Sequence, residues 1–227
     1  MHLELVRRRS PRRVGTRVGT RIGKRAFDLV VGTLCLLVLS PVMVLLALLV
    51  RWTSPGPALF CQTRLGQHGR PFRMYKFRTM QTDCSDAVHR QFVAQLLGEQ
   101  EPGTSNCLEV YKLTRDPRVT RIGTVLRRTS LDELPQLFNV VRGEMSLVGP
   151  RPMLPWEREM IDPRHQDRFT VPAGMTGLWQ VSGRSRLTFT QALDLDVEYA
   201  RRCSLALDLL IVAKTVLVLL LPRGGAQ

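Results

Sequence analysis

The sequence has few acidic residues, and its cysteines and histidines follow no pattern typical of a disulfide framework or a metal site. Its 19 aspartates and glutamates stand against 33 lysines and arginines in 227 residues, which gives a net charge of +14 at pH 7. The five cysteines are an odd number without a C-x-x-C spacing, and the four histidines are scattered. The sequence therefore favours neither a disulfide scaffold nor a zinc site.

The composition indicates one folded domain of moderate size. Hydrophobic residues make up 44% of the chain and charged residues 23%, which suffices for a buried core and argues against a disordered chain. The excess of positive charge predicts a polyanionic partner. Nucleic acid, anionic lipid and phosphorylated substrates all qualify at this point.

The positive charge is concentrated at the start of the chain. Residues 1–26 hold nine cations and one acid, Glu4, and so supply +8 of the total charge. Such a run is often a solvated or disordered arm. Because this one ends at the edge of an apolar segment, it is also consistent with an anchor at a membrane surface.

Residues 27–50 form an apolar segment whose length would allow a membrane span. Pro41 lies within it, removes a backbone donor and favours a bend, which the hydroxyl of Ser40 can stabilise through a released carbonyl. Each of the two resulting arms would reach only about 14–20 Å. A re-entrant helix that enters and leaves one leaflet fits these lengths, and a kinked span is the alternative. Asp28 is expected at the surface, near Lys24 or Arg25.

Two strands are predicted at residues 58–65 and 71–80, around a glycine-containing turn at 66–69. Lys76 and Arg78 alternate along the second strand and are expected to share a face, where two cations suit a phosphate. They would equally serve as charges that protect an edge strand from aggregation. Residues 85–98 are predicted to be helical, and 99–106 to form a surface loop.

The most informative segment is 127–141, in which Leu131, Leu134, Phe138 and Val141 recur at helical spacing and are expected to face the core. Asp132 and Glu133 lie off this apolar stripe. Ser130 and Glu133 match a capping box, so a purely structural role is one interpretation. The other is that the same helix end keeps Asp132 ionised as a nucleophile while Glu133 holds a divalent ion.

Three later segments carry further signals. Arg151 lies between two prolines, which fix the backbone around it and suggest recognition of an oxyanion. Residues 172–184 are rich in glycine and contain Trp179, which is expected in the core more than at a ligand. Residues 205–221 are predicted to form a second, short helix at the membrane surface.

Taken in order, these segments resemble the bacterial sugar transferases, the monotopic phosphoglycosyl transferases that use polyprenyl phosphate. The resemblance covers about residues 22–222 and is carried by residues 24–28, Ser40-Pro41, 75–80, 129–136, 146–152 and 174–184. The larger members of the family have additional membrane helices before this core, and this chain resembles the minimal form.

The resemblance implies an enzyme that transfers a sugar phosphate from a UDP-sugar to undecaprenyl phosphate and releases UMP, which starts the synthesis of a surface glycan. It implies Asp132 and Glu133 as the catalytic pair, with Asp132 as the nucleophile and Glu133 as a ligand of Mg²⁺. It also implies a set of residues that bind the substrate phosphates, namely Lys76, Arg78, Arg127, Arg151 and Arg184.

The expected fold is α+β, predominantly helical and membrane-associated, with a re-entrant helix-break-helix, a small β-hairpin and interfacial helices. The expected organisation is a basic arm over residues 1–22, a membrane anchor over 23–51 and a transferase domain over 52–222. The expected location is the cytoplasmic face of the bacterial inner membrane, with its lipids and downstream glycosyltransferases as further partners. Nucleic acid is not an expected partner, since over half of the charge lies in the arm. The rival classes are a noncatalytic membrane assembly protein and a membrane-tethered nucleic-acid-binding protein.

Overall fold

The computed structural model describes residues 18–81, 118–183 and 187–220. Within them the fold is α+β and mostly helical, as predicted, with two separate two-stranded sheets. The predicted helix at 85–98, the loop at 99–106 and Arg184 lie outside the described residues.

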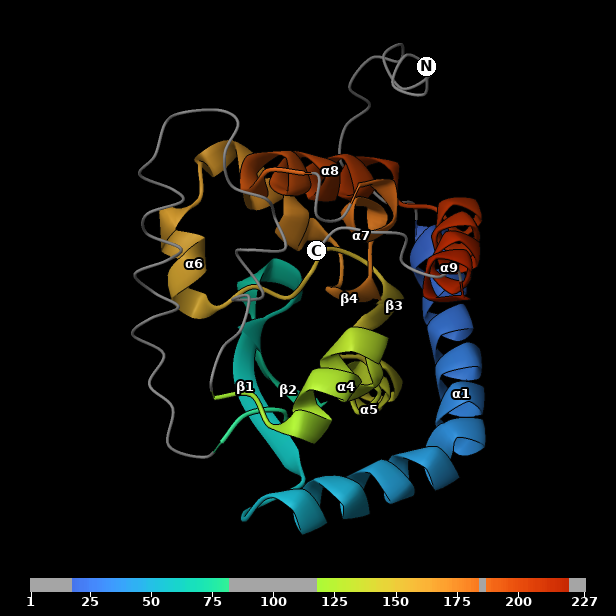
Figure 1. The fold of residues 1–227 in the computed structure, drawn as a ribbon. Helices are drawn as coiled ribbons and strands as arrows, with labels where there is room; N and C mark the ends of the chain where they lie inside the picture. Colours follow the sequence, from blue (N-terminus) through green and yellow to red (C-terminus); the bar gives the residue numbers. More distant parts are fainter. Residues whose placement is uncertain (1–17, 82–117, 184–186, 221–227) are drawn as a thin grey trace.

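The first element, α1 (Val18–Thr53), is a single long helix that contains Pro41 and bends into two arms, one beside α9 and one along the lower edge of the molecule (Figure 1). Pro41 has no N–H to donate to the carbonyl of Leu37. The Ser40 Oγ donates to that same oxygen at 2.7 Å. The predicted bend and the predicted role of Ser40 are therefore confirmed.

Most of the outer surface of α1 is apolar. Among the described residues it is the one helix long and apolar enough to cross a membrane, and little of its apolar part is buried within the protein. The exposed side chains include Ile22, Val30, Leu34, Leu37, Val38 and Leu45. Since a soluble protein would seldom leave so large an apolar surface in water, the protein is membrane-associated.

The predicted hairpin is present as β1 (Leu59–Leu65) and β2 (Pro71–Phe77), paired antiparallel from Leu59↔Phe77 to Leu65↔Pro71. The turn between them contains the short 3-10 helix η2 (Gln67–Gly69), in which His68 and Gly69 both have positive φ. The alternation that predicted the strands also sets their faces, because every second side chain points the same way.

The helical spacing predicted in residues 127–141 is interrupted. The structure has α4 (Arg121–Thr129), the 3-10 turn η3 (Leu131–Glu133) and α5 (Gln136–Arg142). Ser130 ends α4 in a left-handed conformation, with φ 60° and ψ 17°, and its side chain makes no capping bond. The predicted capping box with Glu133 is therefore absent, because such a cap requires an extended backbone.

The interruption also changes which side chains face the core. Leu131 and Leu134 pack against the cluster of α1, β2 and α4, as predicted. Phe138 is 41% exposed, so its prediction as a core residue is wrong, and Leu137 and Val140 are buried instead. A 3-10 turn winds three residues per turn rather than 3.6, which rotates the following helix relative to the predicted stripe.

The second sheet was not predicted. It pairs β3 (Ser146–Val148) in parallel with β4 (Gly174–Thr176), so it joins the two glycine-rich segments. Gly149 donates to the carbonyl of Thr176 at 2.9 Å, and Gly174 to that of Pro150 at 2.8 Å. A Cβ at Gly174 would collide with the backbone of Gly149, which explains the glycine at this position.

The remaining helices close the fold around these sheets. They are α6 (Pro155–Met160), the 3-10 helix η4 (Pro163–Thr170), α7 (Leu178–Ser182), α8 (Phe189–Arg202) and α9 (Leu205–Leu220). Trp179 is buried and packs with Ala192 of α8, as predicted for a core residue. The predicted C-terminal helix is α9, which lies beside the first arm of α1 (Figure 1).

Candidate active site

A cavity lies between the β1–β2 hairpin, η3 and the segment around Arg151. Side chains at alternate hairpin positions share one face, which brings Met74 and Lys76 to the same wall. The other lining residues are Arg64, Glu133, Gln136, Arg151, Pro152, Gly174, Met175 and Gln180. The cavity therefore joins the hairpin, η3 and the two glycine-containing segments around Arg151 and Gly174.

Three of the predicted site residues meet at this cavity: Lys76, Glu133 and Arg151. The Lys76 Nζ lies 2.9 Å from the Glu133 Oε1, and both side chains are mostly but not fully buried. The pair places a cation and a carboxylate at the same wall. Such a wall can contact a phosphate through the ammonium and a cation through the carboxylate.

Asp132 precedes Glu133 in η3 and is buried, with 9% of its surface exposed. It is not among the residues that line the cavity. Arg127 lies in the last turn of α4, half-buried and also outside the lining. Asp132 and Arg127 are therefore close in sequence to Glu133, which lines the cavity, but neither side chain forms part of the cavity wall.

Arg78 is placed differently from its prediction. The strand ends at Phe77, and the Arg78 Nη2 donates to the backbone oxygen and the Oγ of Ser54, both at 2.7 Å. Arg78 is not among the residues that line the cavity with Lys76, so the structure does not bring the two side chains together there. The Arg78 guanidinium instead stabilises the chain just after the end of α1.

Arg151 is held by a buried ion pair that the sequence did not reveal. The Arg168 Nη2 donates to the backbone oxygen of Arg151 at 2.8 Å and to the Asp196 Oδ2 at 2.6 Å. Burial raises the pKa of Asp196 to about 6, and the positive charge of Arg168 opposes that rise. Below that pH the carboxyl group is protonated and the ion pair is lost.

The site also contains residues that sequence reasoning did not assign. Arg64, Gln136 and Gln180 line the cavity beside Lys76 and Glu133. Gln136 and Gln180 lie in the segments 129–136 and 174–184, which the sequence marked as motifs. The sequence did not indicate a role for either glutamine. Arg64 lies on β1, where no motif marked it.

The residues at the cavity fit a divalent cation shared with a substrate. Within the described ranges, no three histidine, cysteine, aspartate or glutamate side chains gather as a metal site. Mg²⁺, however, is commonly bound through one or two carboxylates together with substrate phosphates and water. Glu133, with its carboxylate at the cavity wall, meets that requirement.

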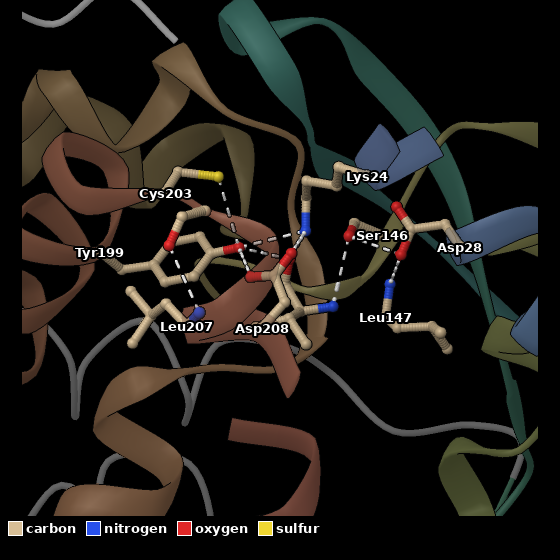
Figure 2. A network of polar contacts seen from close by, with 10 residues as sticks. Lys24, Asp28, Ser146, Leu147, Tyr199, Cys203, Leu207 and Asp208 are labelled. Atoms are coloured by element: carbon tan, nitrogen blue, oxygen red, sulfur yellow. Dashed lines mark hydrogen bonds and ion pairs between the residues drawn. The ribbon is translucent and has the colours of Figure 1, made fainter. Parts of the chain in front are cut away.

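A buried polar network ties both ends of the described chain to the sheet that carries the site (Figure 2). The Lys24 Nζ donates to the Asp208 Oδ2 at 2.6 Å and to the Val148 oxygen at 2.8 Å. The Tyr199 hydroxyl donates to the Asp208 Oδ1 at 2.6 Å. Burial, and next the charge of Asp208, raise the pKa of Tyr199, so it stays neutral.

Asp28 belongs to the same region. It accepts hydrogen bonds from the Ser146 Oγ and the Leu147 N–H, both at 3.0 Å, and is 3% exposed (Figure 2). Asp28 is therefore buried against β3, which supplies the donors that make its burial acceptable. Sequence alone pointed to Lys24 and Asp28 but not to Asp208 or Tyr199.

These features define an α+β fold with a long, bent, apolar helix and a cavity at which Lys76, Arg151 and the Glu133 carboxylate meet. The chain belongs to the bacterial sugar transferase family, which it matches over residues 19–222.

Its relatives include an exopolysaccharide production protein, ExoY, from Sinorhizobium fredii, with 40% identity over 89% of this chain and 87% of that protein. An undecaprenyl-phosphate galactose phosphotransferase from Salmonella typhimurium is 39% identical over 89% of this chain and 41% of that protein. A UDP-glucose:undecaprenyl-phosphate glucose-1-phosphate transferase from Escherichia coli is 41% identical over 85% of this chain and 39% of that protein. The chain thus spans most of the first relative and about two fifths of the other two.

Proposed function

We propose that the protein transfers a sugar phosphate from a UDP-sugar to undecaprenyl phosphate and thereby starts the synthesis of a surface polysaccharide. The names of the relatives from Salmonella and Escherichia state this type of transfer, and that of the Sinorhizobium relative states exopolysaccharide production. The observation that carries the proposal is the meeting of Lys76, Glu133 and Arg151 at one cavity, directly beside Asp132 in the chain.

The proposed reaction has two steps. A carboxylate oxygen of Asp132 attacks the phosphorus that bears the sugar, the bond to the bridging oxygen breaks, and UMP leaves with that oxygen. An oxygen of undecaprenyl phosphate then attacks the same phosphorus, which breaks the bond to Asp132 and yields the lipid-linked sugar diphosphate. Phosphoryl transfer of this kind depends mainly on positioning and on neutralising negative charge.

The basic residues supply that neutralisation in our proposal. Lys76 and Arg151 line the cavity. Arg127 and Arg184 are proposed to complete the phosphate-binding set. Arg78, whose Nη2 holds the end of the hairpin against the chain that follows α1, belongs to the same proposed phosphate-binding set. Glu133 would hold Mg²⁺, and the ion, when bound, would supply further positive charge for the phosphate oxygens.

The membrane arrangement completes the proposal. The bent α1 enters and leaves one leaflet of the inner membrane from the cytoplasmic side, and α9 lies at the membrane surface. This arrangement would bring a soluble nucleotide-sugar and a lipid phosphate to one site. The bend at Ser40 and Pro41 and the apolar exposed surface of both helices support it.

The test is the release of UMP from a panel of UDP-sugars by the purified full chain, with Mg²⁺ and undecaprenyl phosphate. We expect turnover with at least one UDP-sugar, none detectable for Asp132→Asn, and slower turnover with a weaker Mg²⁺ dependence for Glu133→Gln. Absence of UMP release with every donor, from protein that remains folded, would contradict the proposal.

A further inference from the structure

A fully buried asparagine lies between the two elements that carry the Lys76–Glu133 pair. Asn139 belongs to α5, which follows Glu133 in the chain, and its exposed fraction is 0%. The strand β2 carries Lys76 and packs against α5 (Figure 1). A buried amide is costly unless its donors and acceptors find partners. The partners of Asn139 therefore show what its side chain does in the fold.

The side chain of Asn139 binds the backbone of β2 on both sides of Met74. Its Oδ1 accepts from the Tyr75 N–H at 3.1 Å, and its Nδ2 donates to the Arg73 carbonyl at 2.7 Å. In an antiparallel hairpin, alternate residues turn both backbone groups towards the partner strand, and the others leave them at the outer edge. Asn139 therefore occupies the outer edge of β2 as a neighbouring strand would.

The same amide is also fixed from the side of α5. The Asn139 Nδ2 donates to the Glu144 Oε2 at 2.6 Å, just after the end of that helix. The backbone oxygen of Asn139 accepts from the N–H groups of Glu144 and Met145, at 3.0 and 3.2 Å. Both hydrogens of the side-chain amide are therefore used, and these contacts set its orientation.

These bonds connect the two members of the ion pair at the cavity. Lys76 directly follows Tyr75, whose N–H is held by Asn139. Glu133 ends η3, and Leu134 and Pro135 lead from it into α5. Asn139 thus joins the strand that carries the cation to the helix that follows the carboxylate.

We propose that Asn139 is a positioning residue of the candidate active site, which holds β2 against α5 and thereby sets the separation of Lys76 and Glu133. The inference rests on the proposed function, in which Lys76 contacts the substrate phosphates. Asn139 does not line the cavity, so it acts through Lys76 and does not touch the substrate. Its loss weakens the contact between Lys76 and the UDP-sugar.

The bond to the Arg73 carbonyl can be removed with few other changes. The double variant Asn139→Asp/Glu144→Gln exchanges an amide and a carboxylate between the two positions and so keeps the net charge. The new carboxylate can still accept from the Tyr75 N–H and from the new amide, but it has no hydrogen to donate to Arg73. Glu144→Gln alone is the first control, because its amide oxygen can still accept from Asn139. Val140→Ala is the second control, since it removes packing from a fully buried residue of α5 without removing these bonds.

The first measurement needs no substrate. Acetylation of lysines by N-hydroxysuccinimide acetate is followed by peptide mass spectrometry on the full chain in detergent. Lys24 and Lys76 are each paired with a carboxylate, and Lys214, exposed on α9, is the reference. We expect Lys76 to react about fivefold faster in the double variant, the factor that accompanies loss of one partly buried ion pair. Lys24 should react at its original rate.

The second measurement is the dependence of UMP release on the concentration of the UDP-sugar that gives turnover. The double variant should raise KM about tenfold, the factor that accompanies loss of one charge-assisted hydrogen bond. A smaller folded fraction lowers kcat and leaves KM unchanged, so KM separates positioning from stability. Both controls should keep the KM and the Lys76 reactivity of the unmodified protein. If the double variant does not fold, Asn139→Ser replaces it with the same expected results, because the shorter side chain leaves space for a water beside the two backbone groups.

Unchanged reactivity of Lys76, or faster reaction of Lys24 and Lys76 together, would overturn the inference. An unchanged KM would also overturn it, as would an equal rise of KM in Val140→Ala, which would assign the effect to packing. The two proposals fail separately. Unmodified enzyme that releases UMP, with a double variant that behaves identically, refutes only this inference. Faster reaction of Lys76 in the double variant, with no UMP release by the unmodified protein from any UDP-sugar, refutes only the proposed function.

Discussion

Among single residues, Glu133 illustrates what a sequence can and cannot assign. Its position three residues after Ser130 predicted either a helix cap or a site carboxylate. The ion pair with Lys76 and the left-handed Ser130 support the second interpretation. The choice depended on a contact between positions 57 residues apart, which no local pattern contains.

The support of Arg151 is a second feature visible only in three dimensions. Arg168 and Asp196 lie on η4 and α8, and neither belongs to a motif that the sequence singled out. The motif around Arg151 was recognisable because two prolines flank it. Its anchoring was not, because a buried ion pair between distant elements leaves no periodic signal.

This anchoring predicts a pH dependence. Because the pKa of Asp196 in the folded protein is about 6, the carboxylate is charged above that pH and pairs with Arg168. As the pH falls through 6, protonation breaks the pair and loosens the hold of Arg168 on the Arg151 backbone. We expect kcat/KM for UMP release to fall on that acidic side. Asp196→Asn should have low kcat/KM at every pH and lack this limb. An unchanged acidic limb in Asp196→Asn would assign it to another group.

At the scale of secondary structure, the hairpin and the bend of α1 were predictable because their signals are local. Alternation and a glycine turn specify the first, and the Ser40-Pro41 dipeptide specifies the second. The β3–β4 sheet was not predictable, since each strand has three residues and the two lie far apart in the chain.

The close pairing of β3 and β4 makes Gly174 sensitive to substitution. Gly174→Ala should destabilise the protein by about 3 kcal/mol, because the added methyl group meets backbone atoms of Gly149 that cannot move aside. Gly23→Ala in α1 is the matched control, since its Cβ would have no neighbour within 4 Å. That control should be neutral or gain up to about 1 kcal/mol of helix propensity. Unfolding by urea in detergent measures both, and equal stabilities of the two variants would contradict the packing described.

The bend of α1 also carries a prediction. Replacing Ser40 by Ala and Pro41 by Leu restores the hydrogen bond to the Leu37 carbonyl and removes the polar group, which favours a straight helix that spans the bilayer. Cysteines placed before Lys24 and after Arg51 should label from the same side in the unmodified protein and from opposite sides in the double variant. Labelling from opposite sides in the unmodified protein would refute the re-entrant arrangement.

At the scale of the whole molecule, the Lys24–Asp208 pair joins the first arm of α1 to α9 and to the sheet behind the site (Figure 2). Lys24→Met leaves the carboxylate of Asp208 buried without its cation and should cost about 3–5 kcal/mol in the free energy of unfolding. Lys214→Met, an exposed lysine on α9, should cost less than about 0.5 kcal/mol. Thermal unfolding of both variants in detergent provides the comparison, and a Lys24→Met protein as stable as the control would show that the network does not hold the anchor.

In the proposed two-step transfer, Asp132 becomes covalently attached to the sugar phosphate. This step is tested most directly by mass spectrometry of the protein after a brief incubation with UDP-sugar and Mg²⁺ but no lipid acceptor. We expect up to one UMP released per active site and a peptide containing Asp132 that carries the sugar phosphate, with neither seen in Asp132→Asn. Transfer that needs both substrates at once, with no labelled peptide, or turnover that persists in Asp132→Asn, would contradict this step.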